Sequence, residues 1–396
     1  MNTNKHALSF GLITSFLTGL GFTIISPVVP FMVQPFTNSQ QQALIVTSLT
    51  AVYALCTFLA APAIGSLSDR FGRRPILIFS LLGSAIGYLI FGWAGSLWML
   101  FAGRIIDGLT GGNIVALFAY LSDISEPKDR TKIFGWAAAA VGVGTITGPV
   151  IGGLLAQFGN SVPFIFGALI SLINMAYGLI AMPESLTADK RLSSLPARRL
   201  NPFTSLFDLF SLPQLSRLFM VGLLVWLPSG SLQAIVSQFA LDSFAWQAVI
   251  IGLIFAIMGL MDILTQTLGM KFLLKHFSDQ DLMRLALTSE LIGYLLISLS
   301  ALLSLWPLFI LAMFIYAFGD SVFGTAYNGQ VSKTADENDQ GKVQGGSQAL
   351  QSLARVAGPL LGGGLYSSLG HASPAFLGVL FLGLALITVA LNRSSI

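Results

Sequence analysis

Long apolar runs are the feature of this sequence that most restricts its fold. A helix needs roughly 20 apolar residues to cross a bilayer, and twelve such runs stand between charged or turn-rich breaks. Only helices or closed barrels satisfy their backbone hydrogen bonds in lipid, and these runs lack the two-residue alternation of barrel strands. We therefore predict an all-α membrane protein with twelve spans, at residues 7–33, 43–66, 75–94, 97–121, 132–157, 162–182, 215–241, 247–273, 281–303, 306–331, 342–368 and 372–392.

The composition excludes several other classes of protein. Only 9% of the residues are charged, whereas soluble domains carry about 25%. The net charge of +3 is not gathered into a basic stripe, so no nucleic-acid partner is expected. One cysteine and three scattered histidines offer no metal-ligand pattern, and no Walker motif for ATP occurs. Neither a cofactor nor an enzyme activity is expected.

The basic residues predict the orientation of the chain. Lys and Arg accumulate in cytoplasmic loops, and eighteen of the twenty lie at the termini or in every second loop. Both termini are therefore expected in the cytoplasm. The remaining two, Arg104 and Arg355, lie inside the fourth and eleventh spans.

The longest break divides the spans six and six. Residues 183–214 hold four prolines and several basic residues, which predicts a cytoplasmic linker between an N-terminal bundle, 1–182, and a C-terminal bundle, 215–396. Residues Gly135–Leu155 match Gly345–Leu365 at a constant offset of 210, which supports two repeated halves. Secondary transporters have this architecture, with a substrate site near the membrane midplane.

The loop after the second span carries a pattern of small and charged residues, Gly65, Asp69, Arg70, Gly72, Arg73 and Arg74. It resembles the G-x-L-a-D-R-x-G-R-[RK] signature of the major facilitator superfamily at every defining position. A carboxylate at a helix end can form charge-assisted hydrogen bonds with nearby arginines or with a helix terminus. The resemblance implies that Asp69, Arg70, Arg73 and Arg74 latch the outward-facing state. The alternative is a basic loop with no moving part.

The fifth span carries Gly144, Gly148, Pro149, Gly152 and Gly153. It resembles the G-x-x-x-G-P-x-x-G-G signature of antiporters in the same superfamily. Small residues let helix backbones approach, and a proline bends the helix. The resemblance implies export and a seal between the substrate and the wrong compartment, and ordinary small-residue packing is the alternative.

The fourth span reads Arg104-Ile-Ile-Asp107-Gly108, similar to the R-x-x-x-G motif of that superfamily. Arginine at membrane depth is costly and usually functional, and residues three apart on a helix can pair. Protonation of Asp107 would free Arg104 for another partner, which makes the pair a candidate proton switch. A static ion pair would have the same sequence.

Three further acidic residues fall within spans, Asp262, Glu290 and Asp320. In lipid each should face a cavity or pair with an arginine. The resemblance implies that the first, fourth, seventh and tenth spans line the cavity, so Asp107 and Asp320 are the leading proton carriers. Glu290, on a peripheral span, is the weakest candidate. Arg355 is expected either to take part in proton coupling or to pair with Asp262.

The first span resembles the opening of tetracycline and multidrug proton antiporters, with one departure at Thr18, where tetracycline exporters carry an acid. Aromatic side chains of the cavity spans are expected to form an adaptable wall, and amides are expected to orient the substrate. These candidates are Phe16, Phe22, Tyr53, Trp226, Tyr316 and Tyr327, with Gln233, Gln238 and Asn328.

Together the resemblances imply a proton-coupled antiporter that exports lipophilic small molecules, such as drugs, by alternating access. We expect it to act as a monomer in the inner or plasma membrane of a bacterium. A proton symporter that imports a sugar or another nutrient is the alternative, and few paired polar side chains on the cavity spans weigh against it. A scaffold or receptor is disfavoured because buried charge would then be a cost without return.

Overall fold

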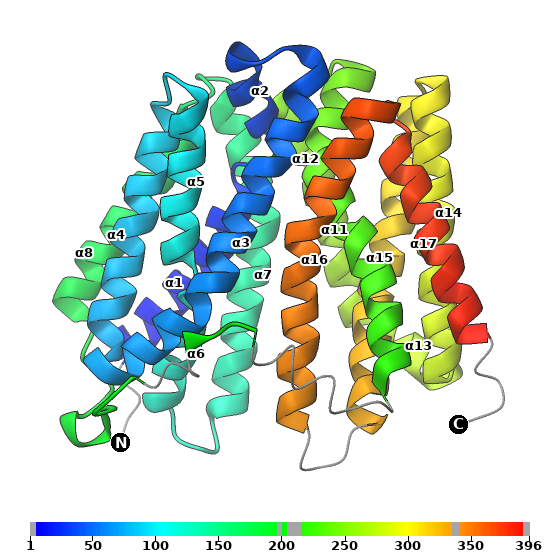
Figure 1. Ribbon diagram of the computed structural model, residues 1–396. Coiled ribbons are helices and arrows are strands. Elements are labelled where there is room, and N and C mark those ends of the chain that lie inside the picture. The colour runs from blue at the N-terminus through cyan, green and yellow to red at the C-terminus, as the bar shows by residue number, and fades with distance from the viewer. Residues whose placement is uncertain (1–4, 196–199, 204–214, 335–339, 391–396) are drawn as a thin grey trace. The chain divides into compact units, whose positions relative to one another are not determined.

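The chain folds into helices wherever its structure can be described. A computed structural model describes residues 5–195, 200–203, 215–334 and 340–390, and all regular elements in these ranges are helical (Figure 1). This confirms the predicted all-α class.

The residues group into two compact units. Unit 1 consists of Met1–Phe36, Val52–Pro202 and Ala248–Gly252, and unit 2 consists of Thr37–Ala51, Phe203–Gln247 and Leu253–Ile396. The division of the helices six and six around a linker at 183–214 stays a prediction. Residues 196–199 and 204–214 of that linker lie outside the described ranges.

Unit 1 contains eight helices of the described chain: α1 (Lys5–Thr23), α2 (Val29–Val33), the larger part of α3 (Ser39–Phe71), α4 (Arg73–Gly92), α5 (Leu97–Gly111), α6 (Ile114–Asp123), α7 (Arg130–Ala156) and α8 (Val162–Ala181). α1 packs along α7 and α8, and α4 packs along α5 and α8. Lipid tails are as apolar as leucine, so such helices associate through close packing rather than through the hydrophobic effect.

Glycines bring the backbones of α1 and α7 together. A Cβ atom on Gly19 would overlap the carbonyl oxygen of Val141, and a Cβ atom on Gly144 would overlap that of Phe16. Any side chain at these positions would separate the helices. The small-residue pattern of the fifth span therefore has a packing role in unit 1.

Two predicted spans are broken in the structure. The first, 7–33, was predicted as one helix, which is wrong: α1 ends at Thr23, a turn follows, and α2 begins at Val29. Pro27 and Pro30 lack the N–H groups that a continuous helix needs. The fourth, 97–121, is divided at Gly112 and Asn113 into α5 and α6, and glycine there lowers the helix propensity.

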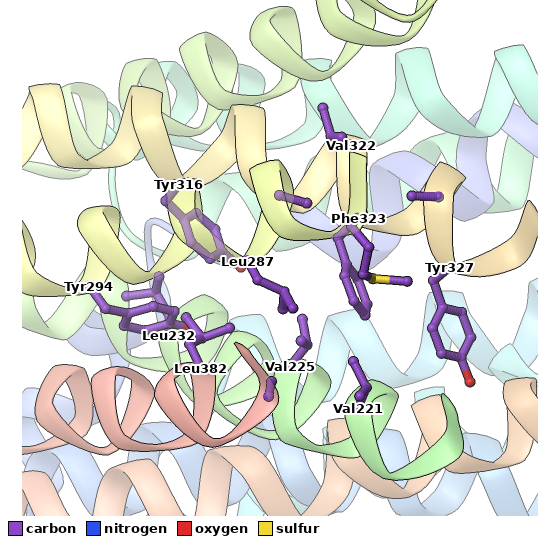
Figure 2. Close-up of a cluster of buried hydrophobic side chains, with 14 of the residues drawn as sticks. Val221, Val225, Leu232, Leu287, Tyr294, Tyr316, Val322, Phe323, Tyr327 and Leu382 are labelled. Atoms are coloured by element: carbon purple, nitrogen blue, oxygen red, sulfur yellow. The ribbon is translucent and has the colours of Figure 1, made fainter. Parts of the chain in front are cut away.

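Unit 2 contains α11 (Ser216–Phe244), most of α12 (Ala248–Leu264), the π-helical turn η4 (Thr265–Gly269), α13 (Met270–His276), α14 (Asp279–Leu303), α15 (Trp306–Thr334), α16 (Gln340–Leu369) and α17 (Ser373–Ala390). α14 packs along α15 and α17, and α11 packs along α16 and α17. Buried aromatic and aliphatic side chains pack together in its core (Figure 2). The rings of Tyr294 and Tyr316 lie edge to face, with their centroids 5.5 Å apart. Such pairs add roughly 0.5–1.5 kcal/mol beyond area burial.

Eleven helices of the described ranges are long and apolar enough to cross a membrane. The predicted span 342–368 folds as α16 but is not among them. Its polar residues include Gln348, Gln351 and Arg355. Two of these polar residues, Gln351 and Arg355, face the cavity described below rather than lipid.

Alanine at Gly144 and at Gly142 should change stability in opposite directions. Gly144→Ala forces α7 away from the Phe16 carbonyl, and overpacking of this kind costs about 1–3 kcal/mol. Gly142 has no atom within 4 Å of its Cβ position, so Gly142→Ala should add roughly 0.5–1 kcal/mol through helix propensity. Thermal unfolding of the purified variants in detergent measures both. Equal midpoints would show that the α1–α7 contact does not need glycine.

Candidate functional site

A cavity of about 230 Å³ lies within unit 2 among α11, α15 and α16. Six of the residues that line it were singled out from the sequence: Trp226, Gln233, Asp320, Tyr327, Asn328 and Arg355. On each helix they recur at spacings of three to four residues or multiples of these, which places them on one face. The cavity therefore joins an acid, a base, amides and aromatic rings in one space.

Asp320 stands in this cavity near the middle of α15. Its carboxylate accepts a hydrogen bond from the Ser229 hydroxyl at 3.3 Å. The same hydroxyl lies 2.5 Å from the hydroxyl of Tyr316, which is almost completely buried. Tyr316, expected in the cavity wall, is instead connected to the acid through Ser229.

The aromatic wall consists of Trp226, Phe323 and Tyr327. The ring of Trp226 meets that of Tyr327 at 4.9 Å and 72°, and that of Phe323 at 6.4 Å and 79°. Edge-to-face contacts hold the rings in defined orientations. These rings offer flat faces on which a planar apolar compound can stack. Aliphatic side chains have no such flat faces.

Gln238, expected in the cavity, lies outside it. The side chain is fully buried, and its amide donates to both carboxylate oxygens of Asp242 at 2.9 and 3.0 Å. Tyr366 donates to the same carboxylate at 2.8 Å. Asp242 therefore joins the end of α11 to α16, and Gln238 orients its carboxylate.

In unit 1, Arg104 and Asp107 form the ion pair that their spacing predicted. The guanidinium lies 3.1 Å from the carboxylate, and both side chains are only 4% exposed. The guanidinium also lies over the Tyr53 ring, 4.0 Å from its centroid. Tyr53 in turn meets Phe22 at 5.9 Å. Phe16 is half-buried on α1, and its carbonyl faces Gly144.

Two acids of unit 2 lie outside the cavity. Glu290 on α14 is fully buried, and both of its carboxylate oxygens lack a hydrogen-bond partner among the described residues. It packs against Gly319, next to Asp320. Asp262 accepts from the Gln266 amide at 2.8 Å.

The latch motif occupies the junction of α3 and α4. Arg73 lies 2.5 Å from Asp69 and 3.2 Å from Asp123, an acid at the end of α6. Its guanidinium also donates to the Ser68 hydroxyl at 2.6 Å. Arg74 donates to the carbonyl of Leu179. Of the other motif residues, Arg70 lies over the Phe71 ring and Gly65 packs against Val115.

The residues of the antiporter motif face two neighbours within unit 1. Gly144 and Gly148 contact α1 between Phe16 and Thr23, and Gly152 contacts the backbone of Ile24, the residue after it. Pro149 and Gly153 contact the first turn of α12, at Gly252 and Ala248.

Several site residues were not foreseen from the sequence. Ser229 and Gln351 line the cavity, and their spacing from Trp226 and Arg355, three and four residues, is the signal that would have found them. Asp123 gave no comparable signal, because its pairing with Arg73 joins helices 50 residues apart. The described residues contain no cluster of three or more His, Cys, Asp or Glu side chains that could hold a metal ion.

A family profile, curated relatives and solved structures were compared with this chain, and all three comparisons found matches. The profile of the Major Facilitator Superfamily matches residues 11–359. Tetracycline resistance protein, class C, of Escherichia coli is 33% identical over 92% of this chain and 91% of its own. Multidrug resistance protein 2 of Bacillus subtilis is 27% identical over 98% and 96%. The crystal structure of the human organic anion transporter MFSD10 has a TM-score of 0.69 and 21% identity over 98% of this chain and 100% of its own.

Removal of one partner of the buried ion pair should destabilise the protein more than removal of both. Arg104→Gln leaves the Asp107 carboxylate without its guanidinium, and such an uncompensated charge costs about 3–5 kcal/mol. Asp107→Asn strands the guanidinium in the same way, whereas the double variant leaves two neutral amides. Thermal midpoints of the three variants form a double-mutant cycle. Additive losses would contradict a coupled pair.

Proposed function

Because this chain belongs to the major facilitator superfamily, we propose that it is a proton-coupled antiporter that exports lipophilic small molecules by alternating access. The observation that carries this proposal is the cavity of unit 2, where Asp320 meets an aromatic wall and amide side chains. A group that can bind a proton and a surface that can bind an aromatic compound lie in one place. The tetracycline and multidrug resistance proteins among its relatives support drug-like substrates.

Exchange requires that proton and substrate exclude each other. A substrate with a positive group would bind the ionised Asp320 and displace its proton. Protonation of Asp320 would in turn remove the charge that holds the substrate. Each ligand then favours a different state of the transporter, which is the thermodynamic condition for coupling.

The other buried charges support this cycle. Asp107 is a second proton site, and its protonation would release Arg104 from the pair. Arg355 shares the cavity with Asp320 and can balance its charge when no substrate is bound. Glu290 is a further candidate proton carrier, because it is fully buried beside Gly319, the neighbour of Asp320 in the chain. Asp262 is another candidate proton carrier, and the Gln266 amide donates a hydrogen bond to its carboxylate.

The two motifs supply the conformational part of the cycle. Asp69, Arg70, Arg73 and Arg74 latch one of the two states and release it in the other. Gly144, Gly148, Pro149, Gly152 and Gly153 form the seal that prevents a leak of protons or substrate. The protein works as a monomer, with both termini in the cytoplasm and the basic loops on that side.

The proton gradient is sufficient for uphill export. One proton that moves through ~100 mV provides about 2.3 kcal/mol, and each unit of pH difference adds about 1.4 kcal/mol. A difference of about two pH units therefore gives roughly 5 kcal/mol, enough for a several-thousand-fold gradient of a neutral substrate. Exchange of one proton for one monovalent cation moves no net charge, so the pH difference alone gives about 2.8 kcal/mol, enough for roughly a hundredfold gradient.

Proton symport is the second candidate, and one observation favours it. Ser229 and Gln351 line the cavity in addition to the polar residues expected there, so it is more polar than the sequence indicated. Arg355 adds a positive charge to this lining. An anion bound at Arg355 would be favoured when Asp320 is protonated, so that anion and proton would move together. The sign of proton movement therefore separates the two candidates.

Luminal pH in proteoliposomes tests the proposal. Vesicles that contain a pH dye, clamped with potassium and valinomycin, receive ethidium, tetracycline or 2-naphthoate from outside. Antiport makes the lumen alkaline, because inward substrate movement drives protons out, and symport makes it acidic. The sign does not depend on how the protein is inserted. Protein-free vesicles report the passive entry of weak acids and bases, and every response is taken relative to them. We expect alkalinisation with ethidium or tetracycline; acidification with 2-naphthoate alone would favour symport, and no response to any compound would contradict both.

Asp320→Asn should abolish proton movement but retain substrate binding. The amide keeps a hydrogen-bond acceptor for Ser229, whereas it cannot exchange a proton. The luminal pH response should fall at least roughly tenfold, which is about 1.4 kcal/mol of coupling, while downhill ethidium counterflow persists. Asp281→Asn, at an exposed acid in the first turn of α14, is the matched control. An unchanged pH response in Asp320→Asn would remove this acid from the coupling mechanism.

A further inference from the structure

The first turn of α4 is stabilised by a side chain from a distant part of the chain. The four N–H groups at the start of a helix have no partner within it. The N-cap residue of α4 is Gly72, which has no side chain to accept them, and no cap from its own side chain is present. The carboxylate of Glu184 accepts the backbone N–H of Arg73 at 2.9 Å and that of Arg74 at 3.2 Å. One carboxylate therefore caps the helix with both of its oxygens.

The chain after α8 is built to present this carboxylate. Pro183 cannot continue the helix, and Met182 leaves it with an extended conformation. Met182 and Leu186 are buried on either side, at 2% and 7% exposure, and anchor the segment. The Leu186 N–H donates to the same carboxylate at 3.0 Å. Glu184 is thus held between two apolar anchors.

Residues 182–192, which we call the strap, also contact the charged residues of the latch. The Ser185 hydroxyl donates at 3.1 Å to Asp123, the acid that binds Arg73. Farther along, the Leu192 N–H donates to the Asp69 carbonyl at 3.0 Å. The strap therefore contacts both acids that hold the Arg73 guanidinium.

The strap packs closely against Gly72, the residue between α3 and α4. The φ of Gly72, +105°, lies in the region that favours glycine. A Cβ atom there would also meet the Glu184 carboxylate, 2.8 Å from its carboxyl carbon, and the Arg191 guanidinium at 3.3 Å. The glycine in the latch motif serves two purposes, since it makes the one-residue turn between α3 and α4 and leaves room for the carboxylate.

From this geometry we propose that Glu184 is a positioning residue of the latch, and that the strap is part of the latch rather than a passive tether. The carboxylate fixes the first turn of α4, where Arg73 and Arg74 are attached, and its charge is favourable at a helix N-terminus. The proposal rests on the latch function proposed above. Loss of the carboxylate should loosen the helix turn that carries the two arginines and change the balance between the two states of the transporter.

Amide hydrogen exchange tests the cap without any substrate. In Glu184→Gln and Glu184→Ala, the Arg73 and Arg74 amides should exchange at least roughly tenfold faster, which corresponds to about 1.4 kcal/mol. Glu126→Gln is the matched control, because Glu126 is an acid whose partner Lys128 lies in an exposed loop. Unchanged exchange at both amides would overturn the cap.

Spin-label distances test the role in the latch. Labels at Lys128→Cys in unit 1 and Lys275→Cys in unit 2, in a Cys56→Ser background, report the ratio of the two states. Glu184→Gln should shift this ratio roughly fivefold to tenfold in the same direction as Asp69→Asn. If Glu184 acts through the latch, adding Glu184→Gln to Asp69→Asn should change the ratio by less than about twofold, because the two effects are not additive.

Each outcome decides a separate point. Faster amide exchange with an unchanged distance ratio would leave the cap and overturn its role in the latch. Fully additive shifts would show that Glu184 acts on the states independently of Asp69. An Asp69→Asn variant with the wild-type ratio would overturn the latch function itself, while amide exchange would still decide whether Glu184 caps α4.

Discussion

An ionisable side chain in the hydrocarbon core is stable only where the protein or a water-filled space replaces its hydration. The chain meets this condition in three ways. Arg104 and Asp107 neutralise each other within one helix. Asp320 faces a cavity and binds Ser229. Glu290 is fully buried, and its carboxylate oxygens have no hydrogen-bond partner among the described residues, which disfavours the ionised acid. The proposed transport chemistry depends on the difference between these surroundings.

Close helix packing determines how deeply those charges are buried. A Cβ atom on Gly87 of α4 would lie 2.8 Å from the Asp107 Cβ atom and from the Gly103 carbonyl, so glycine there lets α5 approach and cover the acid. Gly319 leaves similar room for Glu290, since a Cβ atom on Gly319 would lie 2.8 Å from the Glu290 Cγ atom. Without a hydrophobic driving force between helices, small residues of this kind are what allow tight contacts. The glycines and the buried acids therefore form one arrangement.

Much of this arrangement was accessible from the sequence because it depends on local spacing. Apolar runs predicted the helices, and the separation of three residues predicted the pair of Arg104 and Asp107. Most of the cavity residues chosen in unit 2 share one space. Gln238 does not line this cavity, because its amide binds Asp242 on the same helix, and the sequence does not show which partner a side chain meets.

The residues that were missed depend on contacts between distant segments. Glu184 binds backbone groups more than 100 residues away. Its capping role cannot be inferred from the sequence, because it depends on the two helices lying close together and on the lack of a capping side chain at Gly72. The break after Thr23 was also missed, although Pro27 and Pro30 are both visible in the sequence. An apolar run gives the length of a lipid-facing segment, but prolines decide whether its backbone stays helical.

The π-helical turn η4 gives the eighth predicted span an unusual register. Such a turn is equivalent to one inserted residue in an α-helix, and one residue corresponds to a rotation of about 100°. Lys271 and Lys275 on α13 therefore point about a quarter turn away from where a regular helix would place them. In the turn before η4, the carbonyl of Asp262 accepts from the Ser321 hydroxyl at 3.5 Å, beside Asp320. A relative that lacks one residue in this stretch could be aligned with this chain on both sides of the gap. The basic side chains after the gap would nevertheless keep the same face only if its helix had no π-helical turn.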